Sequence, residues 1–172
     1  MSYFLFGDFS SDLFIEKNIN NLNSVAKEKG IYFHFNGDIN FYDGIHTMLN
    51  EHSMPQNDIQ FCVTTKSQLA ANSHDLLLPW GVYDTEVLFP NGYDDRREFD
   101  NICKKHLSIF EEIYYKFLLI LKPKNLRIFV TEGYDSPEGF IECQCKSEYM
   151  FKDFERQIIE SCDLDSKIYE IE

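Results

Sequence analysis

Basic side chains are scarce in this sequence. Its 172 residues include 16 Lys and Arg against 29 Asp and Glu, which gives a formal net charge of −13 at pH 7. A field of this sign repels nucleic acids and anionic membranes, and it attracts basic proteins. The composition therefore argues against a nucleic acid or a membrane as the partner and favours binding of a basic protein.

Motifs that hold cofactors or perform catalysis are also missing. None of the 8 glycines belongs to a G-x-G-x-x-G or G-x-x-x-x-G-K pattern, so no loop is predicted to cradle phosphates. The five cysteines form no C-x-x-C pair. His34 lies on the more polar face of a predicted strand, and no nucleophile or orienting carboxylate is visible at a predictable spacing. We therefore expect a protein without cofactor, metal or catalytic activity.

The sequence has no long apolar run. The longest strongly apolar run, Phe117 to Leu121, is far shorter than the roughly 20 residues that span a bilayer as a helix. Met1 and Ser2 lead directly into apolar residues, without the basic region that opens a signal peptide. We therefore expect a cytosolic protein whose thiols are reduced.

Aromatic rings, in contrast, are abundant. The chain has 16 Phe and 10 Tyr, and its length allows a core that needs neither disulfides nor a structural metal. We expect a single domain that spans residues 1–172.

The first 36 residues predict a strand, a helix and a second strand. Residues 3–6 form an apolar run that is typical of a buried strand. Residues 15–25 carry apolar side chains at helical spacing, with Asp12 or a neighbouring serine as the predicted cap and Gly30 as the predicted end. Residues 31–35 alternate as in a half-buried strand. A right-handed crossover joins the two strands if they are parallel and share a sheet.

Residues 36–92 are interrupted repeatedly by Gly, Pro and Asn. Within them, residues 59–64 alternate as a strand would, but apolar side chains also recur there at helical spacing. Both interpretations of this segment remain open.

The clearest predicted element is a long helix over residues 95–121. Asp94 and Asp95 favour its N-terminus through the helix dipole, and its length is roughly 40 Å. Its apolar stripe consists of Phe99, Ile102, Cys103, His106, Phe110, Ile113, Phe117, Ile120 and Leu121.

The C-terminal third predicts a hairpin, a helix and a closing strand. Residues 126–131 and 140–145 alternate as two strands joined by a loop. Ser147 is the predicted cap of the last helix, and residues 167–171 predict the closing strand. Together the elements predict an α+β fold, in which helices, including one long central helix, pack on a mixed β-sheet.

Two groups of side chains have residue types that bind metals. Cys143 and Cys145 would share one face of their strand with Ile141, so we interpret them as core thiols. His46 and His52 are separated by five residues, a spacing that fits no single helical face, so we interpret them as part of a polar surface helix.

A Tyr-Asp dipeptide recurs in predicted loops and turns, with further carboxylates close by. A tyrosine ring buries area at low entropic cost, and a carboxylate beside it pairs with Lys or Arg, so this combination suits recognition of a basic surface. The partner-binding residues predicted on this basis are Tyr42, Asp43, Tyr83, Asp84, Glu86, Tyr93, Asp94, Asp95, Glu132, Tyr134, Asp135 and Glu138.

Residues 126–135 (LRIFVTEGYD) and residues 165–169 (DSKIY) resemble bacterial immunity proteins that protect against contact-dependent growth inhibition or other polymorphic toxins. The small size, the acidity and the aromatic loops are similar as well. The resemblance implies a cytosolic, non-catalytic inhibitor that binds one toxin domain, often a basic nuclease, and blocks its active site.

Two alternatives come from other classes of protein. One is a small enzyme, a hydrolase or transferase that uses His and carboxylates. The other is an acidic mimic of nucleic acid.

Overall fold

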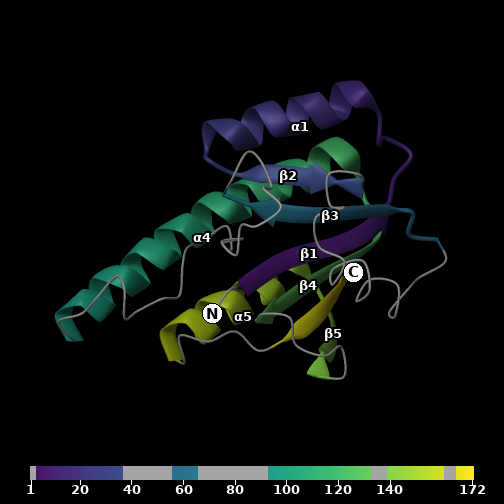
Figure 1. Cartoon of the computed structure of the whole chain (residues 1–172). Coiled ribbons are helices and arrows are strands. Elements are labelled where there is room, and N and C mark those ends of the chain that lie inside the picture. The colour runs from purple at the N-terminus through teal and green to yellow at the C-terminus, as the bar shows by residue number, and fades with distance from the viewer. Residues whose placement is uncertain (1–2, 37–55, 66–92, 133–138, 161–165) are drawn as a thin grey trace.

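Six strands form one mixed sheet in the computed structural model, which describes residues 3–36, 56–65, 93–132, 139–160 and 166–172 (Figure 1). The strands are β1 (Tyr3–Ser10), β2 (Tyr32–Phe35), β3 (Ile59–Thr64), β4 (Lys124–Glu132), β5 (Ile141–Cys145) and β6 (Lys167–Ile171). The described helices are α1 (Glu16–Glu28), α4 (Tyr93–Leu121) and α5 (Ser147–Glu160). The predicted α+β class is confirmed, and residues 59–64 are a strand.

The sheet has the strand order β2-β3-β1-β4-β6-β5. Strands β1 and β2 are both antiparallel to β3, which lies between them, so they are parallel to each other and are joined through α1. The described elements from β1 to β4 thus follow the β-α-β-β-α-β order of a split βαβ motif.

The predicted hairpin of residues 126–131 and 140–145 is wrong. Strands β4 and β5 are not neighbours, because β6 lies between them, antiparallel to β4 and parallel to β5. The chain leaves β5, crosses through α5 and returns as β6. Each strand was recognisable from its alternation, but the identity of its neighbour depends on packing of the following helix.

Helix α4 lies behind the sheet between α1 and α5 (Figure 1). Its predicted apolar stripe is confirmed for most described side chains, but His106 is exposed and Leu107 is buried in its place. Positions 103, 107, 110, 114, 117 and 121 follow one face of the helix. Position 106 falls at the margin of this face, where a polar imidazole remains in water.

The core between helices and sheet is rich in phenylalanine. Phe117 of α4 packs against Phe9, Phe33 and Phe61, with ring centroids 5.3, 5.4 and 5.7 Å away. Gly7 makes this packing possible, because a methyl group there would lie 2.7 Å from the Phe61 ring and would collide with the β4 backbone.

The ends of two helices differ from the sequence predictions. Ile15 precedes α1 without a side-chain cap, because Asp12 pairs with Lys124 instead. Ser147 is the first residue of α5, and its hydroxyl is hydrogen-bonded to Tyr114 at 2.8 Å. Gly30 follows α1 with φ of 73°, as predicted for a residue that ends a helix.

Within the described residues, no helix combines the length and the apolar character that crossing a membrane requires.

Candidate functional site

Most of the predicted partner-binding residues lie outside the described residues, and the structure does not test them. These residues are Tyr42, Asp43, Tyr83, Asp84, Glu86, Tyr134, Asp135 and Glu138. His46 and His52 also lie outside.

The other four belong to regular elements and not to loops. Tyr93, Asp94 and Asp95 form the first turn of α4, and Glu132 is the last residue of β4. The helix begins two residues earlier than predicted, at Tyr93. The side chains of Tyr93, Asp94, Asp95 and Glu132 lie outside the described part, so their contact with a partner stays a prediction.

On the face of the sheet opposite the helices, a row of polar residues crosses the strands. Register and alternation place these residues side by side on one face. At its β2 end, the side-chain oxygen of Asn36 accepts a hydrogen bond of 2.8 Å from the Gln60 backbone. In strand order, the row consists of Asn36, Gln60, Asp8, Arg127, Glu170 and Gln144.

The centre of this polar row is a buried ion pair. The Nε atom of Arg127 donates to Asp8 at 2.8 Å, and a second guanidinium nitrogen of Arg127 donates to the other Asp8 oxygen. Asn57 also donates to Asp8, at 3.0 Å. Each charged side chain is only 5 % exposed, so the pair is closed to a substrate and acts as a structural link between β1 and β4.

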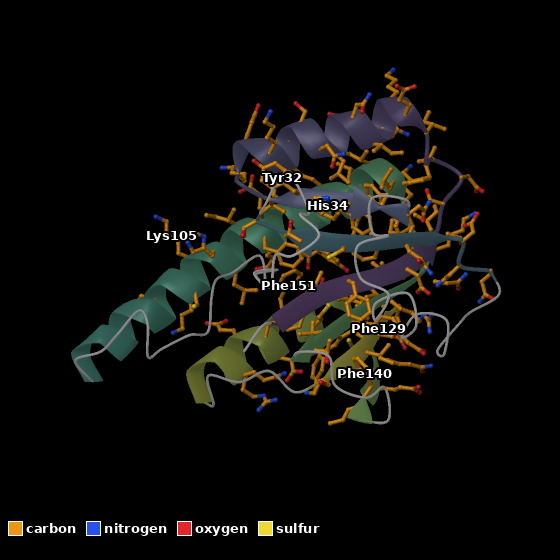
Figure 2. The ribbon with its side chains drawn as sticks, in the orientation of Figure 1. Tyr32, His34, Lys105, Phe129, Phe140 and Phe151 are labelled. Atoms are coloured by element: carbon orange, nitrogen blue, oxygen red, sulfur yellow. The ribbon has the colours of Figure 1, made fainter. Side chains whose placement is uncertain are left out.

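The prediction that His34 lies on the more polar face of its strand does not make that face open to solvent, because aromatic side chains on the same side of the sheet are buried. Phe6 and Phe129 are stacked at 5.2 Å and fully buried, and Phe140 contacts Phe129 edge-on at 5.8 Å (Figure 2). His34 is buried, and its Nε2 atom lies 2.9 Å from the Thr64 hydroxyl. Because it is buried and hydrogen-bonded, this imidazole belongs to the interior of the protein and is not accessible as a base.

A second buried carboxylate, Asp153, lies on α5. Lys167 and the Tyr169 hydroxyl donate to it at 2.8 and 2.7 Å, and Arg156 donates at 2.7 Å. Burial alone would raise the pKa of Asp153, but these hydrogen bonds outweigh burial and lower the pKa. The sequence analysis missed this cluster, for which the only local signal was the spacing of Asp153 and Arg156 along a helix.

The two cysteines of β5 differ in burial. Cys145 is buried and belongs to the core, whereas Cys143 is half-buried, so the core assignment is confirmed for Cys145 and only in part for Cys143. Ile141, predicted on the same buried face, is 55 % exposed because it begins the strand at the margin of the core. Burial and the neighbouring Cys143 raise the pKa of Cys145 to about 12, so it is a poor thiolate ligand.

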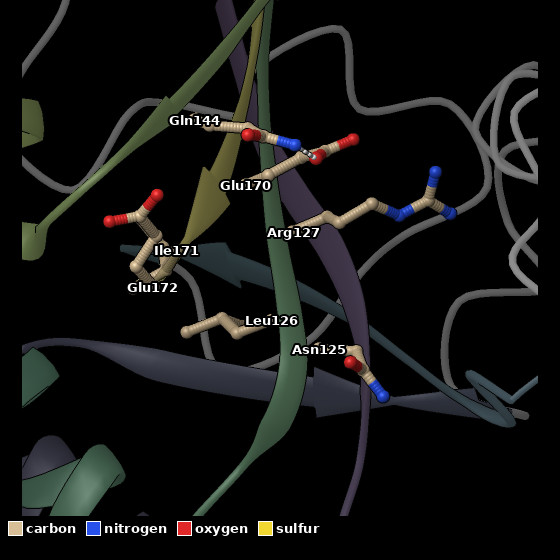
Figure 3. Close-up of a pocket in the computed structure, with 7 residues that line it drawn as sticks. All are labelled: Asn125, Leu126, Arg127, Gln144, Glu170, Ile171 and Glu172. Atoms are coloured by element: carbon tan, nitrogen blue, oxygen red, sulfur yellow. Dashed lines mark hydrogen bonds between the residues drawn. The ribbon is translucent and has the colours of Figure 1, made fainter.

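A hollow of about 230 Å³ lies where β4 begins and β6 and β5 end (Figure 3). Gln144 donates a hydrogen bond of 3.1 Å to Glu170 in its wall. The sequence did not indicate this hollow, because its residues come from three separate strands. It is lined by Asn125, Leu126, Arg127, Gln144, Glu170, Ile171 and Glu172.

Between α4 and α5 the surface carries an exposed ring beside carboxylates. Tyr115 is 38 % exposed. Partial burial, followed by the charges of Glu148 and Glu111, raises its pKa. A groove between the same two helices is lined by Lys104 and Lys152 as well as by Glu111 and Glu148, so its charge is mixed. At the β5 side of the sheet, in contrast, Glu170 and Glu172 lie near an edge strand.

Comparison of the chain with protein-family models, with curated proteins and with solved structures gives no match.

Proposed function

We propose that this protein is an immunity protein that binds a cognate toxin domain, of the basic nuclease type, and neutralises it by covering its active site. The observation that carries the proposal is the distribution of charge along the chain. The intervening segments, residues 37–55, 66–92, 133–138 and 161–165, hold ten acidic residues and one basic residue. The described residues hold 19 acidic and 15 basic residues.

The internal ion pairs do not account for this difference. Among the described residues, the buried carboxylates Asp8 and Asp153 pair with Arg127 and with Lys167 and Arg156. Without these five residues, the described part still holds 17 acidic and 12 basic residues. Of the net charge of −13, the intervening segments contribute −9 and the described residues −4.

These segments also carry three of the four Tyr-Asp dipeptides, at Tyr42, Tyr83 and Tyr134. A basic toxin domain would be steered toward them by long-range attraction, and tyrosine rings would then supply buried contact area. This combination is suited to inhibition of an enzyme whose own active site is basic because it binds a nucleic acid.

The direct test is co-expression with the product of the gene immediately upstream, which the proposal predicts to carry the toxin domain. We expect the toxin domain to co-purify with this protein and the growth of toxin-producing cells to be restored. A control strain carries the same toxin domain with an unrelated acidic protein of similar size. Growth arrest in the presence of the folded protein, without co-purification, would overturn the proposal.

A further inference from the structure

The two edges of the sheet differ in exposure. At one edge, three of the four residues of β2 are buried. At the other edge, Ile141, Glu142 and Gln144 of β5 are all exposed, so side chains on both faces of this strand reach solvent. In the described part of the chain, β5 pairs only with β6. The β5 edge is therefore the more accessible of the two.

The backbone of β5 directs hydrogen-bonding groups away from the sheet. The Ile141 N–H donates to Ser166 at 3.0 Å, and the Cys145 carbonyl accepts from the Glu172 N–H at 3.0 Å, so both residues face β6. Inward and outward residues alternate in a parallel ladder. Glu142 and Gln144 therefore direct N–H and C=O groups to the outer side, which is the arrangement that a further strand can pair with.

The sequence of β5 does not protect this edge. Sheet edges are commonly blocked by proline, by lysine or by a bulge. Strand β5 contains neither residue type, and its pairing with β6 is regular over all five residues. Such an edge is a site for strand addition, in which main-chain hydrogen bonds give affinity and side chains give specificity.

The charge beside the edge identifies the kind of occupant. Glu142 lies on β5, and Glu170 and Glu172 line the adjoining hollow together with the uncharged Gln144 and with Arg127, which is paired with Asp8. A second copy of this chain would bring the same carboxylates against one another. A segment with Lys or Arg would instead place a cation beside Glu170.

We propose that β5 accepts an extended, basic segment of the partner protein as a seventh strand, with a Lys or Arg side chain of that segment in the hollow beside Glu170. This inference rests on the proposed function, since the partner is the toxin domain. It adds a main-chain docking site to the attraction exerted by the acidic segments.

The test compares Gln144→Pro with Gln144→Ala in the full chain, by calorimetric titration with the toxin domain encoded upstream. Proline removes an N–H that β6 does not use, so the fold should survive, as an unchanged melting temperature would verify. We expect Gln144→Pro to weaken binding about tenfold or more, because outward main-chain bonds are lost. Gln144→Ala loses the same side chain but keeps the N–H, so the main-chain contribution is the difference between the two variants, and Gln144→Ala should bind more tightly than Gln144→Pro.

Hydrogen exchange of the parent protein provides a second readout. The amides of Glu142 and Gln144 should exchange rapidly in the free protein and become protected in the complex. Equal affinity of Gln144→Pro and the parent, or unprotected amides in the complex, would overturn strand addition and leave the proposed function standing. Failure of the parent itself to bind the toxin domain would overturn both.

Discussion

The acidic charge is unevenly distributed along the chain. The described part, here called the scaffold, is nearly balanced in charge, with 19 acidic and 15 basic residues. The intervening segments hold ten acidic residues and one basic residue. Ring packing and internal ion pairs stabilise the scaffold, while the net charge proposed to attract a partner comes mainly from the intervening segments. Substitutions in the ring core and in the ion pairs test the first statement, and substitutions of the acidic residues test the second.

The largest effect should come from the ring core of the scaffold. Phe117→Ala removes contacts with Phe9, Phe33 and Phe61, and we expect it to lower the free energy of unfolding by about 4 kcal/mol because it leaves a cavity. Leu119→Ala is the matched control, since Leu119 lies on the same helix but is 73 % exposed. Urea unfolding measures both. Equal stability of the two variants would show that Phe117 does not anchor the scaffold.

The buried ion pair should come next. Asp8→Asn leaves the Arg127 charge in the interior without its countercharge, and we expect a loss of about 3 kcal/mol in the free energy of unfolding. Asp12→Asn is the control, because the Lys124–Asp12 pair lies in water and should add little stability. A thermal melt of each variant distinguishes the two pairs. A small effect of Asp8→Asn would mean that the polar row does not hold β1 to β4.

A smaller, pH-dependent effect should come from Asp153. Its hydrogen-bonded carboxylate has a pKa below the ordinary value of 3.8. Its stabilising contribution is therefore fully present above that value and is lost as pH falls through the lower, folded-state pKa. We expect Asp153→Asn to cost about 2 kcal/mol at pH 6, and the difference from the parent to shrink below pH 3.8. Urea unfolding at pH 6 and pH 2.5 measures this, and a constant difference would contradict it.

Periodicity predicted the individual elements of the scaffold well. Strand β2 and helix α4 follow from the spacing of apolar residues, because that spacing reflects a single buried face, and strand β1 follows from a continuous apolar run. Strand neighbours were less predictable. The order β4-β6-β5 depends on where α5 packs, and no local signal in residues 126–145 indicates that a later strand will lie between them.

The polar contacts inside the scaffold could not be predicted either, because they also depend on which strands become neighbours. Asp8 and Arg127 are 119 residues apart, and they meet only because the register of β1 and β4 places them opposite each other. His34 was assigned to a polar face by its own strand, yet burial of that face depends on the rest of the molecule. Charge, in contrast, is a property of composition. The acidity of the intervening segments was therefore available from the sequence.

The association rate of the toxin domain tests most directly whether the intervening segments attract the partner. Two triple variants each remove three negative charges, at different positions. One carries Asp43→Asn, Asp84→Asn and Asp135→Asn in the intervening segments. The other carries Glu16→Gln, Glu28→Gln and Glu155→Gln, all exposed on scaffold helices.

Surface plasmon resonance at low and physiological salt measures both variants against the toxin domain encoded upstream. At low salt, we expect the segment variant to associate about tenfold more slowly than the parent, with most of the difference lost as salt screens the field. The scaffold variant should remain close to the parent. Equal association rates for the two variants would contradict the assignment of partner attraction to the intervening segments.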